Sequence, residues 1–390
     1  MKSAYINNKS YLPDITLMAA PATTAISEVW KWGANNLLPN ALSALSRSSP
    51  IHRRILIDKA DYISGRGFKC EDRRVTALCT SCNNNFQSLR AIMQRVALDK
   101  CFFGNATLEI VLEEGKIALY HQDVTRARLS KDKKYIVLNS DWSNYKSTES
   151  RTLPLYPLFE KQSDGTIRSI VHYKDYEPMF ENYGVPKYIA ALGAIAIAHK
   201  TERWNITRID NAFSLSGVMV LDGSTSTEQE AEQIAQEAQR RFEGTPGQVM
   251  FMVKNSSESD TSKFVPITTS NDGDWESLHD QSTEDIIVAH SWFRTLSGME
   301  YTSGFSSERV ENEYNIALST VIKSEQQDII EPIQRTISKY TELDASTLEI
   351  VNLPPFDPRQ PYMRVWEARK ADGLTFDSNS TEEHQFLSQI

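Results

Sequence analysis

The sequence predicts an α+β protein that is mainly helical. Over most of the 390 residues, apolar side chains recur at spacings of three and four, which is the period of an amphipathic helix. Between about residues 106 and 173 the spacing changes to two, which is typical of short strands. Helices and strands occupy separate stretches, so we expect antiparallel strands lying on a helical platform. The chain is 40% hydrophobic, which is enough to bury a substantial core.

The first part of the chain, residues 1–185, is expected to form one α+β domain. A first helix should begin at Pro39, a second should span residues 51–63 and stop at a glycine-containing segment, and a third should span 89–103. Strands are predicted at residues 106–112, 117–120, 125–129, 135–138 and 167–173, with a hairpin turn at 113–116.

A long helix is predicted for residues 186–213. Pro186 suits the first turn, where the missing N–H of proline has no helical partner to lose. The first half is rich in alanine and glycine, and small residues allow close approach of neighbouring backbones. Two interpretations stay open: a central helix buried in one subunit, or a helix packed between symmetry copies of the chain.

A compact strand–helix–strand unit is predicted next, within residues 215–270. The first strand covers residues 217–221 and the second 248–253. Between them a helix begins at Ser226 or Thr227, which provide a capping box, and ends at Gly244. The unit contains few apolar residues, so we expect it to need neighbours for stability.

A second long helix is predicted for residues 271–294, and its first half is acidic. No lysine or arginine occurs between residues 271 and 285, whereas six carboxylates do: Asp272, Asp274, Glu276, Asp280, Glu284 and Asp285. The simplest interpretation is a solvated acidic face. A divalent-metal site is the alternative, but the carboxylates are not spaced like those of a calcium loop.

The remainder of the chain is predicted to contain a loop, a long helix and a polar tail. Residues 297–306 form a glycine-containing loop, with Gly298 and Gly304. A helical pattern covers residues 307–340, and Pro332 should kink or restart it. The tail, residues 344–390, bears prolines and polar side chains.

Catalytic motifs are absent from the sequence. The chain has no phosphate-binding GxxxxGK[ST] loop, no GxGxxG turn, no HExxH and no GxSxG, and its seven histidines are scattered. We therefore predict that the protein is not an enzyme and uses no cofactor. Cys79 and Cys82 form a CxxC pair, but without a second pair nearby we expect ordinary thiols rather than a zinc site.

The charge and hydropathy of the chain limit the kinds of partner that we expect. The formal net charge is −9, whereas a protein that clamps nucleic acid tightly is usually basic. The N-terminal sequence has no apolar core of the kind a signal peptide needs, and the longest run of apolar and small residues is residues 188–198. That run is too short for a bilayer, which needs about 20 residues. We expect a soluble protein without a membrane partner, made in the cytoplasm.

Seven short segments, in order along the chain, resemble the portal proteins of tailed bacteriophages, in the group of HK97-like and PBSX-like portals. They are residues 32–39 (WGANNLLP), 60–68 (ADYISGRGF), 183–189 (YGVPKYI), 211–219 (NAFSLSGVM), 242–245 (FEGT), 283–290 (TEDIIVAH) and 321–323 (VIK) with Gln326. The sequence departs from the family at Ser324, where a proline usually follows VIK, and near Phe293, where the family often has a proline.

The resemblance implies a portal fold and a closed ring, commonly of twelve subunits. In that fold, residues 1–185 correspond to the wing, 186–214 and 271–294 to two stem helices, and 215–270 to the clip. Residues 295–306 correspond to the tunnel loop, 307–343 to a long wing helix and 344–390 to a small crown. An alternative is another oligomeric scaffold or adaptor of a virion, and a metal-dependent enzyme using residues 272–285 is a further one.

The resemblance also assigns expected roles to particular residues. The tunnel loop would present Ser297, Gly298, Met299, Glu300, Tyr301, Thr302, Ser303, Gly304 and Phe305 to the DNA. Channel-lining candidates are Asp272, Asp274, Glu276, Asp280 and Glu284, whose charge would repel the phosphate backbone and let the duplex slide. Partner-docking candidates in the clip are Glu228, Glu232, Arg240 and Arg241.

The partners implied are further copies of the chain, double-stranded DNA, the terminase large subunit, the major capsid protein with its scaffold, and a head–tail adaptor. The protein would be assembled in the host cytoplasm and would lie at the portal vertex of the virion. Because the chain has no phosphate loop, ATP hydrolysis would belong to the terminase.

Overall fold

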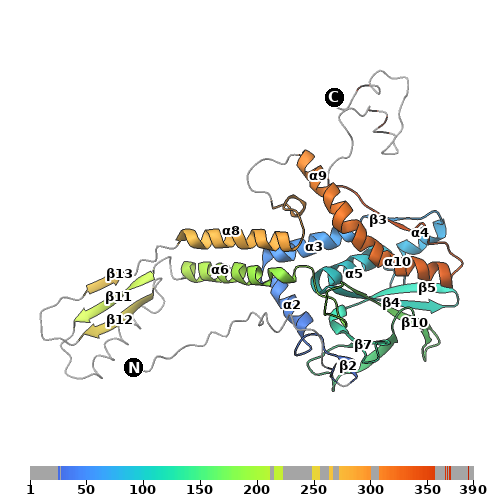
Figure 1. Cartoon of the computed structure of the whole chain (residues 1–390), viewed down its shortest axis with the longest axis horizontal. Helices are drawn as coiled ribbons and strands as arrows, with labels where there is room; N and C mark the ends of the chain where they lie inside the picture. The colour runs from blue at the N-terminus through green and yellow to red at the C-terminus, as the bar shows by residue number, and fades with distance from the viewer. Residues whose placement is uncertain are drawn as a thin grey trace.

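The computed structural model of the chain describes residues 25–26, 28–210, 215–222, 248–254, 263–266, 272–299 and 307–355, together with Val365, Glu367, Arg369 and Gln385. Figure 1 shows a body of helices and sheets from which two antiparallel helices extend side by side, with a small sheet at their far end. The fold is therefore α+β, as the sequence predicts.

Four helices in the first part of the body begin and end at the residues that local chemistry favours. The helices are α2 (Leu38–Arg47), α3 (Pro50–Ser64), α4 (Arg73–Thr80) and α5 (Leu89–Phe103). The side chains of Ser49 and Ser88 cap α3 and α5 by accepting a backbone N–H of the first turn. Gly65 and Gly104 follow α3 and α5 with positive φ, which glycine adopts without steric cost. Only α4 was not predicted.

A four-stranded antiparallel sheet covers part of this helical layer, in the order β5-β4-β10-β9. Its strands are β4 (Asn105–Glu113), β5 (Lys116–Gln122), β9 (Glu160–Lys161) and β10 (Ile167–Lys174). Glu114 and Gly115 both have positive φ and form the predicted hairpin turn between β4 and β5. The central strand β4 is buried over its first eight residues, so it is covered on both faces.

Smaller sheets complete the body. A three-stranded sheet contains β6 (Ala127–Leu129), which follows the short helix η1 (Val124–Arg126), β7 (Tyr135–Asn139) and β8 (Ser150–Pro154). Two-stranded pairs join β1 (Ala25–Ile26) to β2 (Val29–Trp30) and β3 (Gly67–Lys69) to β14 (Glu349–Val351). The pairing of β3 with β14 was not predicted, since it joins residues far apart in the sequence.

The two extended helices are α6 (Leu192–Asp210) and α8 (Asp272–Ala289), and both are shorter than predicted. The turn η2 (Ile189–Ala191) precedes α6, so the helix begins after residue 186 because the preceding residues are held by contacts with the body. Helix α8 ends before residue 294 because Ser291 adopts a positive φ of 49°, which a helix cannot continue through.

The sheet at the far end of the helix pair has the order β12-β11-β13. Strands β11 (Leu215–Asp222) and β12 (Gln248–Lys254) are parallel, and β13 (Lys263–Pro266) pairs with β11 in antiparallel fashion. A parallel pair requires a crossover connection of a dozen or more residues. The predicted helix between β11 and β12 lies outside the described residues, and β13 was not predicted.

The long C-terminal helical segment is interrupted at a place the sequence did not indicate. It consists of α9 (Ser307–Ala317), the π-helix η4 (Leu318–Ile322) and α10 (Lys323–Tyr340). Pro332 lies inside α10 and does not restart it, because the neighbouring isoleucines of α10 are buried in the body. Instead, the buried positions Ala317 and Ile322 are five residues apart, and the wider π turn accommodates that spacing.

Two hydrophobic clusters form the core of the body. The first joins α2, α3 and the body ends of α6 and α8, and contains Trp32, Tyr188 and Trp292. The second lies between the four-stranded sheet, α5 and α10. Leu98 and Cys101 of α5 pack against both clusters. In the part of the chain that the structure describes, no helix combines the length and apolar character needed to cross a membrane.

Candidate functional site

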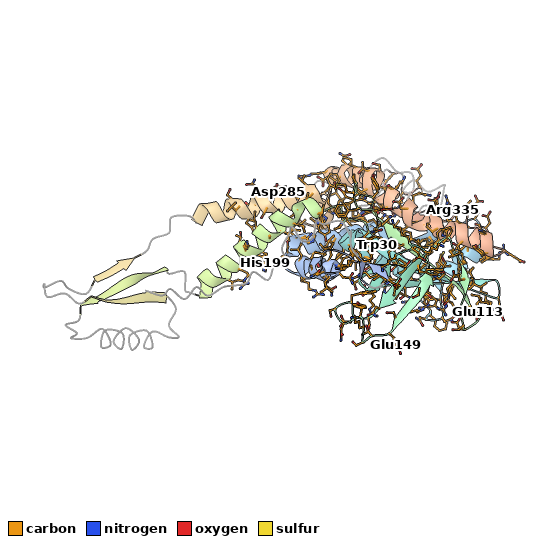
Figure 2. The ribbon with its side chains drawn as sticks, turned by 60° about the horizontal axis from the view of Figure 1, so that its bottom comes forward. Trp30, Glu113, Glu149, His199, Asp285 and Arg335 are labelled. Carbon is orange, nitrogen blue, oxygen red and sulfur yellow. The ribbon has the colours of Figure 1, made fainter. Side chains whose placement is uncertain are left out.

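The helix pair of α6 and α8 is the most distinctive functional feature of the fold. On α6 the buried positions Leu192, Ile195 and Ala198 recur at helical spacing. On α8, Ile286 and Ile287 are buried. Figure 2 marks His199 on α6 and Asp285 on α8. The stripes of the two helices meet along the pair and at the body, so neither helix can turn without breaking this packing.

The part of this seam on α8 is partly polar, and its hydroxyls are satisfied within their own helix. Ser282 and Thr283 are buried, and both donate to the carbonyl of His279, at 2.8 and 2.9 Å. Thr201 of α6 donates to the carbonyl of Ile197 at 3.0 Å. A buried hydroxyl with a partner carries little desolvation cost, so the pair tolerates these residues.

The acidic candidates on α8 differ in their surroundings. The side chain of Asp280 is 77% exposed, and Asp285 is also exposed. Glu284 forms an ion pair with Arg294, so one candidate carboxylate is partly neutralised within its own subunit. Helix α8 includes Asp272, Asp274 and Glu276, but the structure describes only their backbone and not their side chains.

The segment just before α6, which we call the root of α6, passes close to the body because the backbones of Gly184 and Gly104 approach each other. Asp175 donates its backbone N–H to the carbonyl of Gly104 at 2.8 Å, and a Cβ placed on Gly184 would lie 2.6 Å from that Asp175 nitrogen. The buried amide of Asn105 holds Gly184 from both sides, since its Oδ1 accepts from Gly184 N and its Nδ2 donates to Gly184 O, each at 2.8 Å. The segment that precedes α6 therefore has no room for a side chain at residue 184.

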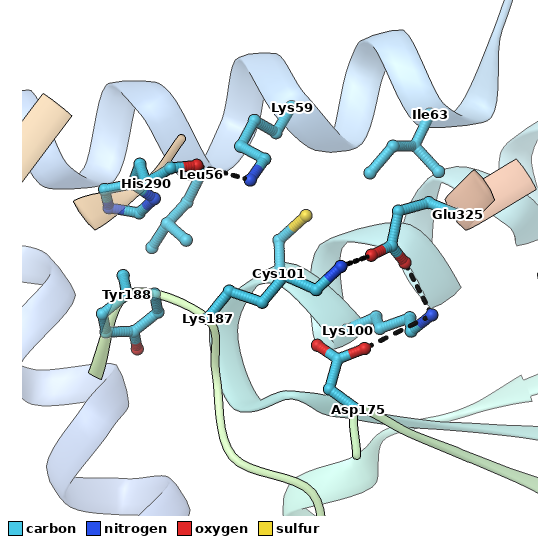
Figure 3. Close-up of a pocket in the computed structure, with 10 residues that line it drawn as sticks. All are labelled: Leu56, Lys59, Ile63, Lys100, Cys101, Asp175, Lys187, Tyr188, His290 and Glu325. Carbon is cyan, nitrogen blue, oxygen red and sulfur yellow. Dashed lines mark hydrogen bonds and ion pairs between the residues drawn. The ribbon is translucent and has the colours of Figure 1, made fainter. Parts of the chain in front are cut away.

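A charge cluster lies next to this root (Figure 3). Lys187, just before α6, pairs with Glu325 at the start of α10, and Glu325 also pairs with Lys100 of α5 at 2.6 Å. Lys100 reaches Asp175 at 3.4 Å. Burial by itself would lower the pKa of Lys100, but Glu325 and Asp175 raise it overall. Burial would raise the pKa of Glu325, but the two lysines hold it below its usual value.

Two buried histidines join α8 to α3 beside this cluster. His52 Nδ1 and His290 Nε2 lie 2.8 Å apart, so one ring donates and the other accepts. Burial lowers the pKa of His52 to about 3 and that of His290 to about 2. Lys59, also buried, donates to the carbonyl of His290 at 2.9 Å. The end of α8 is thus attached to α3 by neutral rings and a lysine.

The segment that follows α8 is anchored in the body before it reaches the expected loop. The short helix η3 (Thr295–Ser297) is buried, and the hydroxyl of Ser297 accepts from Trp292 Nε1 at 3.0 Å. Gly298 has a φ of 67°, and Met299 is partly buried and donates its N–H to Arg294 O. Glu300, Tyr301, Thr302, Ser303, Gly304 and Phe305 lie outside the described residues.

The other sequence-derived candidates are placed as follows. Glu228, Glu232, Arg240 and Arg241 lie outside the described residues. Cys79 and Cys82 are buried free thiols, and burial raises the pKa of Cys79 to about 12 and of Cys82 to about 11. Within the described ranges, no group of three or more histidine, cysteine, aspartate or glutamate side chains is arranged to hold a metal ion.

Sequence reasoning did not single out Arg128, which the structure places at the centre of the body. Its side chain is fully buried, donates to Asn36 Oδ1 at 2.6 Å and lies over the rings of Trp32 and Trp142, with Cζ 5.4 and 5.0 Å from their centres. The WGANNLLP segment was the available signal, because Trp32 and Asn36 both belong to it. Partners distant in sequence could not be inferred from one sequence.

The non-glycine residue Ser291 supplies a direct test of the backbone strain at the end of α8. Its φ of 49° lies in the left-handed region and its side chain is exposed. Ser291→Gly is expected to raise the free energy of unfolding by about 0.5–1 kcal/mol, because glycine adopts this conformation without a Cβ clash. Urea unfolding of the variant beside Ser291→Ala checks this, and a less stable glycine variant would contradict it.

The chain resembles known proteins in sequence and in fold. A family described as "Phage portal protein" matches residues 56–287. A chain of the "Virion of native gene transfer agent (GTA) particle" is similar at 16% identity and a TM-score of 0.54, over 86% of this chain and 93% of that one. A chain of the "Neck of native GTA particle computed with C12 symmetry" is similar at 16% identity and a TM-score of 0.55, over 93% and 98%. No curated protein sequence matches the chain.

Proposed function

This chain belongs to the phage portal protein family, and from that premise we propose that its copies form a ring around a channel at one vertex of a virion, through which double-stranded DNA is packaged and ejected. The observation that carries the proposal is the helix pair: α6 and α8 extend from a firmly held root and carry a separate small sheet away from the body. An enclosed channel needs such a stiff, repeated wall element.

The parts of the subunit take their proposed roles from this arrangement. The wing is proposed to comprise residues 1–185 and 307–343, whose described part lies in the body, and α6 and α8 are proposed as the stem. The sheet of β11, β12 and β13 belongs to the clip, residues 215–270. Residues 344–390 are proposed as the crown, but their first part belongs to the body, where β14 pairs with β3 and Leu348 is buried. Residues 295–306 are the tunnel loop, and the buried helix η3 at its start supports the proposal by anchoring the loop.

The acidic residues of α8 are proposed to keep DNA mobile in the channel. Asp280, which is 77% exposed, and Asp272, Asp274 and Glu276 would present negative charge to the phosphate backbone. Glu284 would contribute less, because it pairs with Arg294. Like charges repel over a range set by salt, about 8–10 Å under physiological conditions, so only lumen-facing groups act. A wall that repels phosphate allows sliding in both directions.

The partners of the ring are proposed from the same family membership. The clip would bind the terminase large subunit during packaging and a head–tail adaptor afterwards, with Glu228, Glu232, Arg240 and Arg241 as candidates. The wing would contact the major capsid protein and its scaffold. The family is structural, and we propose that the chain has no catalytic role, with ATP hydrolysis carried out by the terminase.

Electron microscopy of the purified chain tests the proposal. We expect rings with a central hole, and twelve subunits is the expected number because the similar neck was computed with C12 symmetry. Light scattering should give the corresponding mass. A chain that remains a monomer at every concentration and salt tested would contradict the proposal. Rings that never associate with a terminase or a capsid protein would favour a different virion adaptor.

A further inference from the structure

The helix pair exposes apolar side chains that its own subunit does not cover. In the part of the chain with described side chains, Ile197 and Ile206 on α6 are 43% and 57% exposed, and Leu278 and Val288 on α8 are 40% and 73% exposed. Leaving apolar surface in water is unfavourable, and its burial favours association. Several apolar groups together on an extended element indicate a contact surface.

On α6, Ile197 belongs to one exposed face, and Ile206 lies on the other side of the helix. Gly193, Ile197 and Lys200 are all exposed and stand at spacings of four and three, so they lie along one side of the helix, opposite the buried Ile195. A Cβ placed on Gly193 would meet nothing within 4 Å. We call these three residues the α6 outer face; it is open, partly apolar and basic.

On α8 a second face has the opposite charge. Leu278, Gln281, Asp285 and Val288 are exposed and stand at spacings of three and four, away from the buried Ile286. We call them the α8 outer face; it is partly apolar and acidic. Helices α6 and α8 contact each other, and both outer faces consist of residues that this contact leaves exposed.

The two outer faces are offset by about one helical turn along the pair. Helix α8 contacts η2, so its last residue lies near the level at which α6 begins. With a rise of about 1.5 Å per residue, Lys200 lies about 12 Å and Asp285 about 6 Å from the body. The four-carbon stem of lysine can span that difference. Ile197 and Val288, about 8 and 2 Å from the body, are offset by the same amount, so one axial shift between neighbouring copies brings both pairs level.

We propose that the α6 outer face of one copy packs against the α8 outer face of the next copy, with Lys200 beside Asp285 and Ile197 near Val288. This inference rests on the proposed function, in which copies form a ring. Two different complementary faces on one subunit make a head-to-tail contact, and such contacts close into rings when the rotation allows it. The exposed aliphatic groups supply burial, and the opposite charges select the register.

Charge reversal tests the pairing. Lys200→Glu places two carboxylates at every contact and Asp285→Lys places two ammonium groups there, so each variant alone should lose ring assembly by about tenfold or more in the protein concentration required. A one-to-one mixture should assemble again, because alternating copies give Glu–Lys and Lys–Asp contacts in turn. With one variant carrying a mass tag, native mass spectrometry should show even-numbered rings with equal numbers of both.

The controls separate this inference from the proposed function. Glu114 is an exposed carboxylate at the β4–β5 turn, away from the helix pair. Glu114→Lys makes the same charge change as Asp285→Lys and should leave assembly unchanged. Wild-type rings together with single variants that assemble normally would overturn the pairing and leave the ring proposal intact, as would a mixture that fails to recover. A wild-type chain that forms no ring would overturn both.

Discussion

Replacing Glu325 by glutamine is expected to lower the free energy of unfolding by about 3–5 kcal/mol, because removing one member of a buried ion cluster leaves the others charged without a partner. The side chains of Glu325 and Lys100 are only 7% and 5% exposed, and Glu325 is the carboxylate closest to Lys100. Lys100 would then keep only the longer contacts with Asp175 and Asp328, at 3.4 and 3.3 Å. Urea unfolding of the full-length variant measures the loss.

Glu331→Gln is the matched control for Glu325→Gln. Both are glutamates of α10 paired with a cation, but the side chains of Glu331 and its partner Arg335 are 42% and 69% exposed. An exposed pair of this kind contributes at most about 1 kcal/mol. Equal losses for the two variants would show that the cluster at the root of the stem does not behave as a buried unit. A selective loss at Glu325 should also reduce ring yield, since the cluster joins the start of α6 to α10.

Acidification is expected to destabilise the body through His52 and His290. Above pH 6.5, the ordinary pKa of histidine, both rings are neutral whether the chain is folded or unfolded, so they add no pH dependence. Below pH 6.5 both histidines become protonated in the unfolded chain. In the folded chain they stay neutral until the pH approaches their lowered pKa values of about 3 and 2. Stability therefore falls as the pH falls, by about 5 kcal/mol for the pair between pH 6.5 and pH 4.5.

Histidine replacements assign this slope to its source. In the double variant His52→Gln/His290→Gln, the unfolding free energy should depend less on pH between 6 and 4.5. The slope should correspond to about two fewer protons bound on unfolding than in the wild type. His172 is half-buried, with a pKa lowered to about 4, so His172→Gln should remove about one proton from the slope. A slope in the double variant that equals the wild-type slope would show that the His52–His290 contact is open to water.

The sequence by itself was sufficient for the helices and strands whose ends are set by local chemistry. Ser49 and Ser88 mark the starts of α3 and α5, and Gly65 and Gly104 their ends, because capping and positive φ depend on adjacent residues alone. The hairpin at Gly115 and the alternating pattern of β4 were predictable for the same reason. The portal family was also identified from the order of short segments, and the match over residues 56–287 confirms it.

Only the tertiary structure decided what depends on partners far apart in the chain. Glu325 meets Lys187 and Lys100 across more than a hundred residues, and Arg128 meets Asn36 across ninety-two. The starting point of α6, the π turn before α10 and the neutralisation of Glu284 by Arg294 likewise follow from packing and ion pairs. A sequence pattern reports which face of an element is apolar, but not which other element will cover it, because that choice is made by the packing of the whole body.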